Sequence, residues 1–255
     1  MRLKMCLVSL FSCIILFSCK KESNKTIVIS NTSLKNIESS KILSYIINPK
    51  KQSLKFYWKN KEDSILKTFK NIKTEVESNN EALVFAMNGG MFKKDFSPQG
   101  LYIENGEKVT KLDTINKGYG NFYLQPNGVF SITKSGIPTI TTTKEFIYNK
   151  VINYATQSGP MLVIDGELHS KFNKGSSNLN IRNGVGILSN GNLLFAMSKE
   201  KINFYDFATF FKSNGCKDAL YLDGFVSRTY LPSKNWEQLE GNFGVIIVET
   251  KSKDN

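Results

Sequence analysis

The amino-acid sequence predicts an α+β fold: a single domain with a mixed, largely antiparallel β-sheet core and flanking helices. The first observation behind this prediction is a series of short apolar or alternating segments, separated by Asn-Gly and Asp-Gly pairs typical of β-hairpins. The second is a pair of segments whose apolar residues recur at three- and four-residue spacing, as in amphipathic helices. The third is size, because about 230 residues follow the N-terminal segment and suffice for one hydrophobic core.

The first half of the domain is predicted to form a strand, a helix and a second strand. Residues 54–58 favour a strand, and Asp63 or Ser64 is expected to cap the helix that follows. The apolar face of this helix consists of Ile65, Phe69, Ile72 and Val76. The apolar run 82–87 then predicts a buried strand that stops at Asn88-Gly89-Gly90.

Hairpins and a second helix are predicted for the rest of the chain. Hairpin turns are expected at Asn105-Gly106, Pro126-Asn127-Gly128, Asp165-Gly166 and Asn190-Gly191. The second helix has an apolar face made of Phe204, Phe207, Ala208 and Phe211. It is expected to end near Gly215, because glycine readily takes the left-handed conformation that follows many helices. A short strand at 219–222 then leads into Asp223-Gly224, and 243–248 is predicted as the last buried strand.

The N-terminus has the layout of a bacterial lipoprotein signal peptide, which we assign to residues 1–18. Two basic residues, Arg2 and Lys4, precede an apolar run over 7–17 that is too short to span a bilayer as a stable anchor. The run ends in Leu-Phe-Ser-Cys, which resembles a lipobox. The alternative is an ordinary signal peptide with a chance cysteine.

Cys19 is accordingly predicted to carry lipid and to become the mature N-terminus. Residues 19–40, rich in Lys, Asn, Ser and Glu, are predicted to be a lipidated tether, and 41–255 to be the functional domain. Acyl chains on Cys19 would attach the protein to a membrane of the bacterial cell envelope. The expected location is therefore exported, envelope-bound and lipid-anchored.

Charge and cysteine content exclude several classes of function. The chain has a formal net charge of +12, but its lysines are dispersed and the protein is predicted to be exported, so we expect no nucleic acid partner. Once Cys6, Cys13 and Cys19 are assigned to the signal and the lipid, only Cys216 remains, which leaves no disulfide. With one histidine, a Cys/His zinc site is excluded, and no metal or cofactor is predicted.

Arginine is rare beyond the first nineteen residues, where only Arg182 and Arg228 occur. A planar, two-pronged guanidinium suits the oxygens of a phosphate or carboxylate, and both residues lie in short motifs that contain Gly or Ser. The alternative is a structural ion pair with a buried aspartate. If the strands before Asn88-Gly89-Gly90 and Asp223-Gly224 are parallel neighbours, these two loops converge beyond the carboxyl ends of the strands, where ligands bind.

Four motifs occur in a fixed order along the chain. They are Asn88-Gly89-Gly90-Met91-Phe92, Ala155-Thr156-Gln157-Ser158-Gly159-Pro160-Met161-Leu162, Ile181-Arg182-Asn183-Gly184-Val185-Gly186 and Leu220-Tyr221-Leu222-Asp223-Gly224. Together they resemble the phosphodiester glycosidase domain family over residues 80–248. The resemblance implies a mixed β-sheet core with flanking helices and a hydrolase that cleaves a sugar-1-phosphodiester.

Such a reaction needs a carboxylate at the anomeric carbon and donors for the phosphate leaving group. We assign the carboxylate to Asp223, as nucleophile or base, and the phosphate clamp to Arg182, with Asn88 and His169 as further catalytic candidates. The candidates for substrate binding are Gly89, Gly90, Gln157, Ser158, Gly159, Asn183, Gly224, Ser227 and Arg228. The expected substrate is a phosphorylated glycan or a sugar-1-phosphodiester.

Alternatives remain open at the sequence level. His169 is either an acid/base group with a pKa near neutrality or a hairpin residue with a satisfied ring. One branch of the family has a further glycine after its Asp-Gly, where this chain has Phe225. That departure and the shortage of acid/base pairs favour a noncatalytic envelope module that binds an anionic glycan or a partner protein. Hydrolysis of the phosphate ester itself would need a metal cluster, which the spacing of Asp95, Asp206 and Asp218 does not specify.

Overall fold

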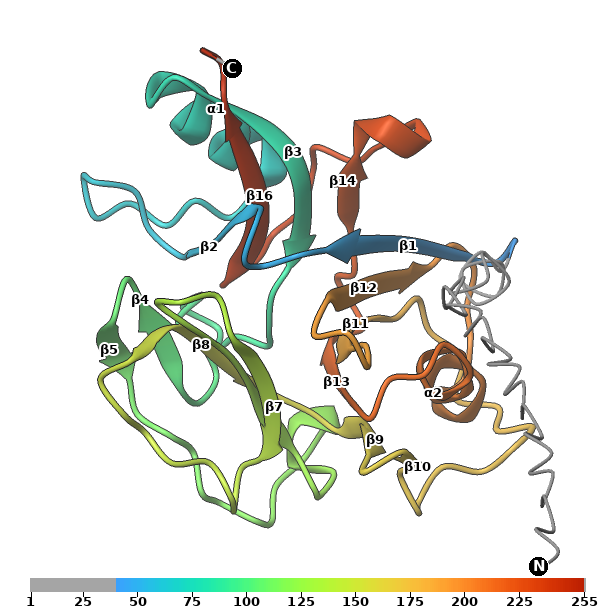
Figure 1. The fold of residues 1–255 in the computed structure, drawn as a ribbon. Helices are drawn as coiled ribbons and strands as arrows, with labels where there is room; N and C mark the ends of the chain where they lie inside the picture. The colour runs from blue at the N-terminus through green and yellow to red at the C-terminus, as the bar shows by residue number, and fades with distance from the viewer. Residues whose placement is uncertain (1–39, 255) are drawn as a thin grey trace, which may run out of the picture. The chain divides into compact units, whose positions relative to one another are not determined.

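The computed structural model describes residues 40–254, which form the domain discussed below (Figure 1). The predicted signal peptide, the lipidation at Cys19 and almost all of the predicted tether lie outside the described residues. Within residues 40–254, no helix is both long and apolar enough to cross a membrane. The described part is built mainly of antiparallel strands with two α-helices, which confirms the predicted α+β class.

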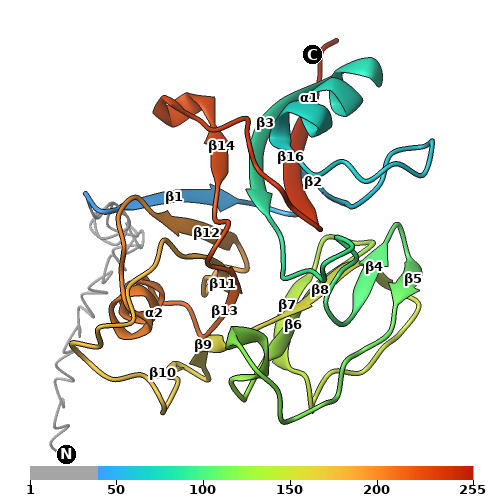
Figure 2. The same cartoon turned by 180° about the vertical axis from the view of Figure 1, so that it is seen from behind.

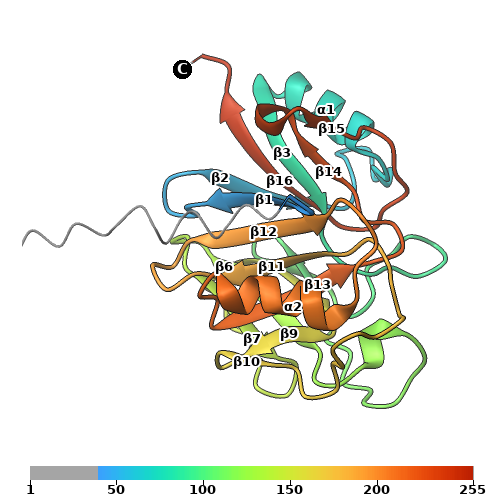
Figure 3. The ribbon, with the colours of Figure 1, turned by 90° about the vertical axis from the view of Figure 1, so that its right-hand side faces the viewer.

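The first sheet carries the C-terminal half of the candidate site. Its strands, in spatial order, are β1 (Ile42–Ile47), β12 (Leu193–Ser198), β11 (Asn183–Ile187), β13 (Asp218–Asp223), β9 (Met161–Ile164) and β10 (Glu167–Leu168), and every pairing is antiparallel. Helix α2 (Phe204–Ser213) lies across one face of this sheet, as Figure 3 shows. Asn203 caps the helix by accepting from the Asp206 backbone N–H, and the chain leaves it at Gly215, whose φ of 80° is left-handed as predicted.

The second sheet carries the N-terminal half of the site. Its strands, in spatial order, are β15 (Trp236–Glu237), β14 (Thr229–Leu231), β3 (Glu81–Asn88), β16 (Ile246–Ser252) and β2 (Ser53–Tyr57). Helix α1 (Phe69–Ser78) packs its buried face against β3, and the short 3₁₀ helix η3 (Pro232–Lys234) links β14 to β15.

The third sheet has the strand order β5 (Glu107–Thr110), β4 (Tyr102–Glu104), β8 (Ile152–Ser158), β6 (Gly128–Thr133) and β7 (Pro138–Thr142). A 3₁₀ helix, η2 (Asn121–Tyr123), lies on the long connection between β5 and β6. The chain runs from β8 almost directly into β9, which carries it from the third sheet into the first (Figures 1 and 2).

A cluster of aromatic rings holds the three sheets together. Phe56 of β2 lies 5.6 Å from Phe130 of β6, and Phe85 of β3 lies 5.2 Å from Phe195 of β12, between ring centroids. Phe130 and Phe195 make an edge-to-face contact at 6.2 Å. Since all four rings are fully buried, the domain has one main core at the place where its sheets meet.

Several predicted elements were wrong in detail. The first helix begins at Phe69 and not near residue 64, because Asp63 and Lys67 have left-handed φ angles of 63° and 61° and Thr68 provides the N-cap. The signal at 126–128 is no hairpin, since η2 precedes it and Gly128 starts β6. The last strand begins at Ile246, after the tightly packed Gly244.

The strands that end at Asn88 and Asp223 are not parallel neighbours, so the condition set for the convergence of their loops is not met. Strand β3 pairs with β14 and β16, whereas β13 pairs with β11 and β9, so the two strands belong to different sheets. The hairpins at Asn105-Gly106, Asp165-Gly166 and Asn190-Gly191 are confirmed.

Candidate active site

The ends of three strands meet at a buried junction formed by Asn88, Asn183 and Asp223. Asn183 pairs with Asp223 in the register of β11 and β13, and its amide oxygen accepts the Asp223 backbone N–H at 2.8 Å. The Asn183 amide nitrogen donates to both the backbone and the side-chain oxygen of Asn88, each at 2.9 Å. One asparagine therefore ties the end of β3 in the second sheet to the end of β13 in the first.

The loop after β13 closes back onto the same junction. The Ser227 hydroxyl donates to the Asp223 backbone carbonyl, and the Arg228 backbone N–H donates to the Asn88 side-chain oxygen at 3.0 Å. The Asn88 amide nitrogen, by contrast, is buried without a hydrogen-bond partner. An unpaired buried donor of this kind costs free energy, which makes Asn88 Nδ2 an exception at an otherwise paired junction.

Asp223 is the carboxyl group at this junction. Its residue is only 9% exposed, and burial raises the pKa of the carboxyl to about 7 despite hydrogen bonds from the backbone N–H groups of Gly224 and Phe225, which act in the opposite direction. It takes part in none of the ion pairs found among residues 40–254. Asp223 therefore changes its protonation state near neutral pH, as acid/base groups of hydrolases do.

Tyr221 lies two residues before Asp223 on β13, and the register of β13 against β11 shifts between them, as at a β-bulge. Its hydroxyl hydrogen-bonds the Asn121 side chain and lies 3.4 Å from Arg182 Nη1. A Cβ atom on Gly224 would collide with this hydroxyl oxygen. Glycine is thus required beside Asp223 so that the loop can pass over the tyrosine.

Arg182, the predicted phosphate clamp, is enclosed by protein. It is 0% exposed, its Nε donates to the Ile202 carbonyl at 2.8 Å, and its Nη2 donates to the Asn178 carbonyl at 2.8 Å. Its guanidinium carbon lies 3.5 Å from the centre of the Phe204 ring, and burial lowers its pKa. In this conformation the guanidinium positions Tyr221 and the segment around Asn178, and direct contact with a phosphate stays a prediction.

His169 belongs to an aromatic stack that ends at Arg182. Its ring stacks on Phe172 at 4.7 Å, Phe172 stacks on Phe204 at 4.9 Å, and Phe204 faces the arginine. The His169 Nε2 atom hydrogen-bonds the Gln125 carbonyl at 3.1 Å, and burial lowers the pKa of the imidazole. The structure therefore places His169 at the other end of this stack from Arg182, with its ring nitrogens hydrogen-bonded to the Gln125 carbonyl and the Lys171 backbone N–H.

Gln157 braces the long loop that precedes η2. Its side-chain oxygen accepts from the backbone N–H groups of Leu101 at 3.0 Å and Asp113 at 2.9 Å. Its side-chain nitrogen donates to the Asp113 carbonyl at 2.7 Å and to the Thr143 hydroxyl at 3.0 Å. All four hydrogen-bonding positions of this amide are satisfied within the protein, so Gln157 supports the site through the loop.

Four further predicted residues support the strands that form the junction. They are Ser158, Gly89, Gly90 and Gly159. The Ser158 hydroxyl donates to the Leu222 carbonyl at 2.6 Å, which fixes the end of β8 against the end of β13. Gly89, Gly90 and Gly159 allow close packing. A Cβ on each would meet, in turn, the side chains of Ile247, Thr156 and Asn127.

Arg228 is the more accessible of the two arginines. It is half-buried, and its Nη1 donates to the Ser227 carbonyl at 2.9 Å.

Sequence reasoning missed Tyr221 and Asn121 as parts of this site. Tyr221 stands in the same sequence motif as Asp223, Leu220-Tyr221-Leu222-Asp223-Gly224, and that is the signal that could have identified it. No local signal identifies Asn121, which is brought in by the fold.

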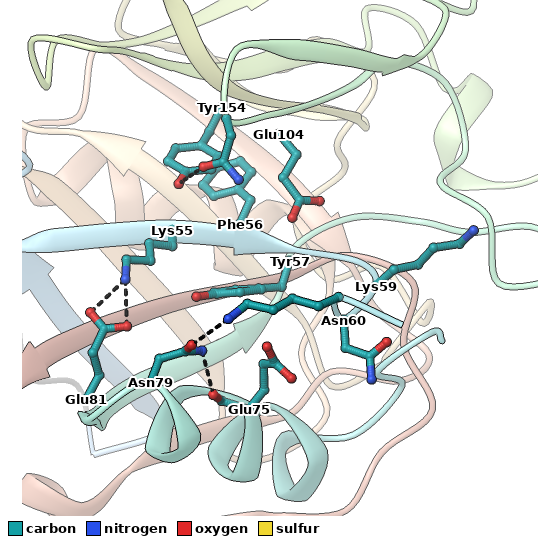
Figure 4. Close-up of a pocket in the computed structure, with 12 residues that line it drawn as sticks. Lys55, Phe56, Tyr57, Lys59, Asn60, Glu75, Asn79, Glu81, Glu104 and Tyr154 are labelled. Carbon is teal, nitrogen blue, oxygen red and sulfur yellow. Dashed lines mark hydrogen bonds and ion pairs between the residues drawn. The ribbon is translucent and has the colours of Figure 1, made fainter. Parts of the chain in front are cut away.

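A separate polar pocket of about 410 Å³ lies between β2, α1 and the β4–β5 hairpin (Figure 4). It is lined by charged and aromatic side chains, among them Lys55, Tyr57, Glu75, Glu81 and Glu104. None of the junction residues Asn88, Asn183 and Asp223 lines it. The pocket and the junction are therefore two distinct polar regions.

The motifs that form the junction also define a family. The family model described as phosphodiester glycosidase matches residues 81–248, which include all three junction residues. The chain belongs to the phosphodiester glycosidase family. This membership supports a glycosidase-type function and confirms the resemblance drawn from the four motifs.

Similar proteins agree with this assignment at the level of family and fold. This phosphodiester glycosidase family member is 36% identical over 193 residues to the uncharacterized protein YigE of Escherichia coli, covering 74% of each chain. Its fold is similar to the catalytic domain of zebrafish N-acetylglucosamine-1-phosphodiester alpha-N-acetylglucosaminidase, with a TM-score of 0.56 at 14% identity over 83% of this chain and 84% of that one. A putative exported protein from Burkholderia pseudomallei has a TM-score of 0.55 at 11% identity, covering 86% and 76%.

Proposed function

We propose that the protein is a hydrolase that cleaves the bond between a sugar and a phosphodiester, with Asp223 as its catalytic carboxyl group. The observation that carries the proposal is a single buried carboxyl whose pKa is raised to about 7, at the point where the family motifs converge. A carboxyl with such a pKa is half ionised at neutral pH and can both accept and return a proton.

The reaction balances with water as the second substrate. The oxygen of water bonds to the anomeric carbon while the bond from that carbon to the phosphate oxygen breaks. Ionised Asp223 faces the positive charge that develops at the anomeric carbon and accepts a proton from the water. The products are the free sugar and a phosphate monoester, which is a good leaving group and needs little help from an acid.

The phosphate is assigned to the accessible side of the loop that holds Asp223. Arg228 is half-buried and next to the junction, and its planar guanidinium suits two phosphate oxygens. Arg182, which is fully enclosed, acts through Tyr221 in this proposal, and so the phosphate contact moves from Arg182 to Arg228.

The cellular setting in the proposal comes from the sequence. A predicted signal at 1–18 and a lipid-anchored Cys19 would hold the domain at a membrane of the bacterial envelope, with a phosphorylated glycan or a sugar-1-phosphodiester as substrate. Palmitate labelling of the expressed chain, with Cys19→Ser as the control, tests this part. Equal labelling of both proteins would remove the anchor from the proposal.

Sugar release tests the reaction itself. Full-length protein is incubated with a panel of sugar-1-phosphodiesters that includes N-acetylglucosamine-1-phospho compounds and nucleotide sugars, and free sugar is measured. We expect release by the wild type and none by Asp223→Asn, with both proteins unfolding at similar temperatures near pH 6. Release at the same rate by both proteins would remove Asp223 from the mechanism.

A noncatalytic envelope module is the second candidate. Phe225 is 94% exposed and lies two residues after Asp223, the carboxyl of the junction. An exposed aromatic side chain at this place also suits a surface that binds a ligand without cleaving it. Such a module would bind a phosphorylated glycan with saturable affinity and release no sugar from any substrate. The same assay, combined with a binding measurement, separates the two functions.

A further inference from the structure

Two exposed aromatic residues lie near Asp223 in the fold, one in the loop that follows it and one in the segment before η2. Phe225, which follows the Asp223-Gly224 pair, is 94% exposed. Tyr119 is 101% exposed and lies two positions before Asn121, whose side chain hydrogen-bonds the Tyr221 hydroxyl. Gly224 passes over the same hydroxyl. Both exposed rings therefore project from segments that meet at one buried atom of the site.

A third segment adds an aliphatic side chain. Arg182 reaches the Tyr221 hydroxyl with Nη1 and the Asn178 carbonyl with Nη2. Leu179, the next residue along the chain, is 47% exposed. We define the apolar rim as Tyr119, Leu179 and Phe225. Its members come from three distant parts of the sequence. The segments of Tyr119 and Phe225 reach the Tyr221 hydroxyl, and the segment of Leu179 reaches Arg182, which contacts that hydroxyl.

The composition of the rim indicates what it contacts. Exposed apolar area is unfavourable in water, and burying it against a hydrocarbon is favourable. Exposed Lys117 and Lys174 lie on the same segments as Tyr119 and Leu179, so the rim combines apolar surface with positive charge. A ligand that carries both a hydrocarbon chain and a phosphate matches this combination.

We propose that the apolar rim binds the hydrocarbon chain of a lipid alcohol esterified to the substrate phosphate. The substrate class is then a sugar-1-phosphate diester of a long-chain alcohol, and the product is the lipid monophosphate. The assignment rests on the proposed function, since the rim borders the carboxyl that cleaves the sugar from the phosphate. It goes beyond that function because it specifies the alcohol side of the diester.

Binding of the product tests the inference without turnover. Titration calorimetry on the full-length protein compares ethyl, butyl, hexyl and octyl phosphate below their micelle concentrations, with octanol as the probe that lacks phosphate. We expect octyl phosphate to bind at least about tenfold more tightly than ethyl phosphate, because each buried methylene adds affinity. Octanol should bind much more weakly than octyl phosphate.

Surface variants test whether the apolar rim causes the dependence of affinity on chain length. Phe225→Ser and Leu179→Ser should flatten the dependence of affinity on chain length. The matched control is Ile137→Ser, which removes another apolar side chain, 49% exposed, from the β6–β7 hairpin tip that packs against Pro49. This control should keep the full dependence. Since all three residues are at least partly exposed, the variants should unfold at the temperature of the wild type.

Three outcomes would overturn the inference. The first is an affinity for alkyl phosphates that does not change with chain length. The second is equal binding of octanol and octyl phosphate, which would make the rim a membrane- or protein-docking patch independent of the phosphate site. The third is equal loss in Ile137→Ser. Sugar release by the wild type in any of these cases would leave the proposed function standing, whereas chain-length-dependent binding without sugar release would retain the lipid site and remove the hydrolase.

Discussion

The Asp223 junction and the pocket of Figure 4 use charged groups in opposite ways. The pocket holds several lysines and glutamates, and Lys55 is paired with Glu81 at 2.6 Å, with both side chains partly exposed. The junction holds one buried carboxyl that joins none of the ion pairs found in the described part of the chain. The region with the most charged side chains is therefore not the region with the carboxyl whose pKa is raised to about 7.

The difference lies in what surrounds each carboxyl. Burial raises the pKa of Glu104 in the pocket, but the hydrogen bond from the Tyr102 hydroxyl at 2.7 Å opposes this shift. Asp223 is more completely buried and receives only backbone N–H groups, and its pKa reaches about 7. Isolation from water and from cations, more than the number of charges, creates a group that titrates at neutral pH.

The largest expected effect contrasts the two carboxyl regions in catalysis. Asp223→Asn should lower kcat/KM for sugar release by about a thousandfold or more, in the range typical of a lost acid/base group. Glu81→Gln in the pocket is the matched control and should leave the rate near that of the wild type. Steady-state kinetics on the best substrate of the panel measure both. A similar loss in both variants would show that the pocket contributes to the chemistry and would end the contrast.

The second effect contrasts a buried cation with an exposed one. Arg182→Ala should destabilise the fold by about 3 to 5 kcal/mol, because it leaves the Asn178 carbonyl unpaired, removes one of the two hydrogen bonds to the Ile202 carbonyl and removes the contact with Phe204. Lys55→Ala, which breaks a partly exposed ion pair with Glu81, should cost about 1 kcal/mol or less. Urea denaturation measures both values. Equal costs would mean that the Arg182 environment is far looser than its contacts indicate.

The third effect is the pH dependence of stability at Asp223. Its pKa is raised from 3.8 to about 7 on folding, so the folded state favours the protonated carboxyl. The stability associated with that proton is fully present below pH 4 and is lost as the pH rises through 7. Asp223→Asn lacks this titration and should gain, relative to the wild type, on the order of 3 kcal/mol between pH 4 and pH 8. Parallel stability curves for the two proteins across this range would contradict the raised pKa.

Sequence reasoning predicted the elements that obey a strong local period. The face of α2, its end at Gly215 and three Asn-Gly or Asp-Gly hairpins are local patterns, and all are confirmed. The start of α1 was misplaced because the apolar spacing continues upstream to Ile65. That residue instead bridges to Lys59 before Thr68 caps the helix. Hydrophobic spacing alone does not reveal a left-handed backbone at Asp63 or Lys67.

The candidate site was predicted in part for a similar reason. The motifs placed Asn88, Asn183 and Asp223 in one family-wide set, and the structure brings them together. The route differs from the parallel neighbours that the sequence argument had taken as its condition, since Asn183 joins two antiparallel sheets. Burial is a property of the whole fold, so the sequence could not show that Arg182 is enclosed while Arg228 is half-exposed.

The smallest expected effect tests the close packing of the loop that follows Asp223. Gly224→Ala should destabilise the protein by about 1 to 3 kcal/mol, because the new Cβ would collide with the Tyr221 hydroxyl. Tyr221→Phe removes that oxygen, so the double variant should recover part of the loss. A double-mutant cycle in urea measures the coupling between the two positions. Additive losses would mean that the loop already stands clear of Tyr221, and the hydroxyl would then no longer link Asp223's loop to Arg182.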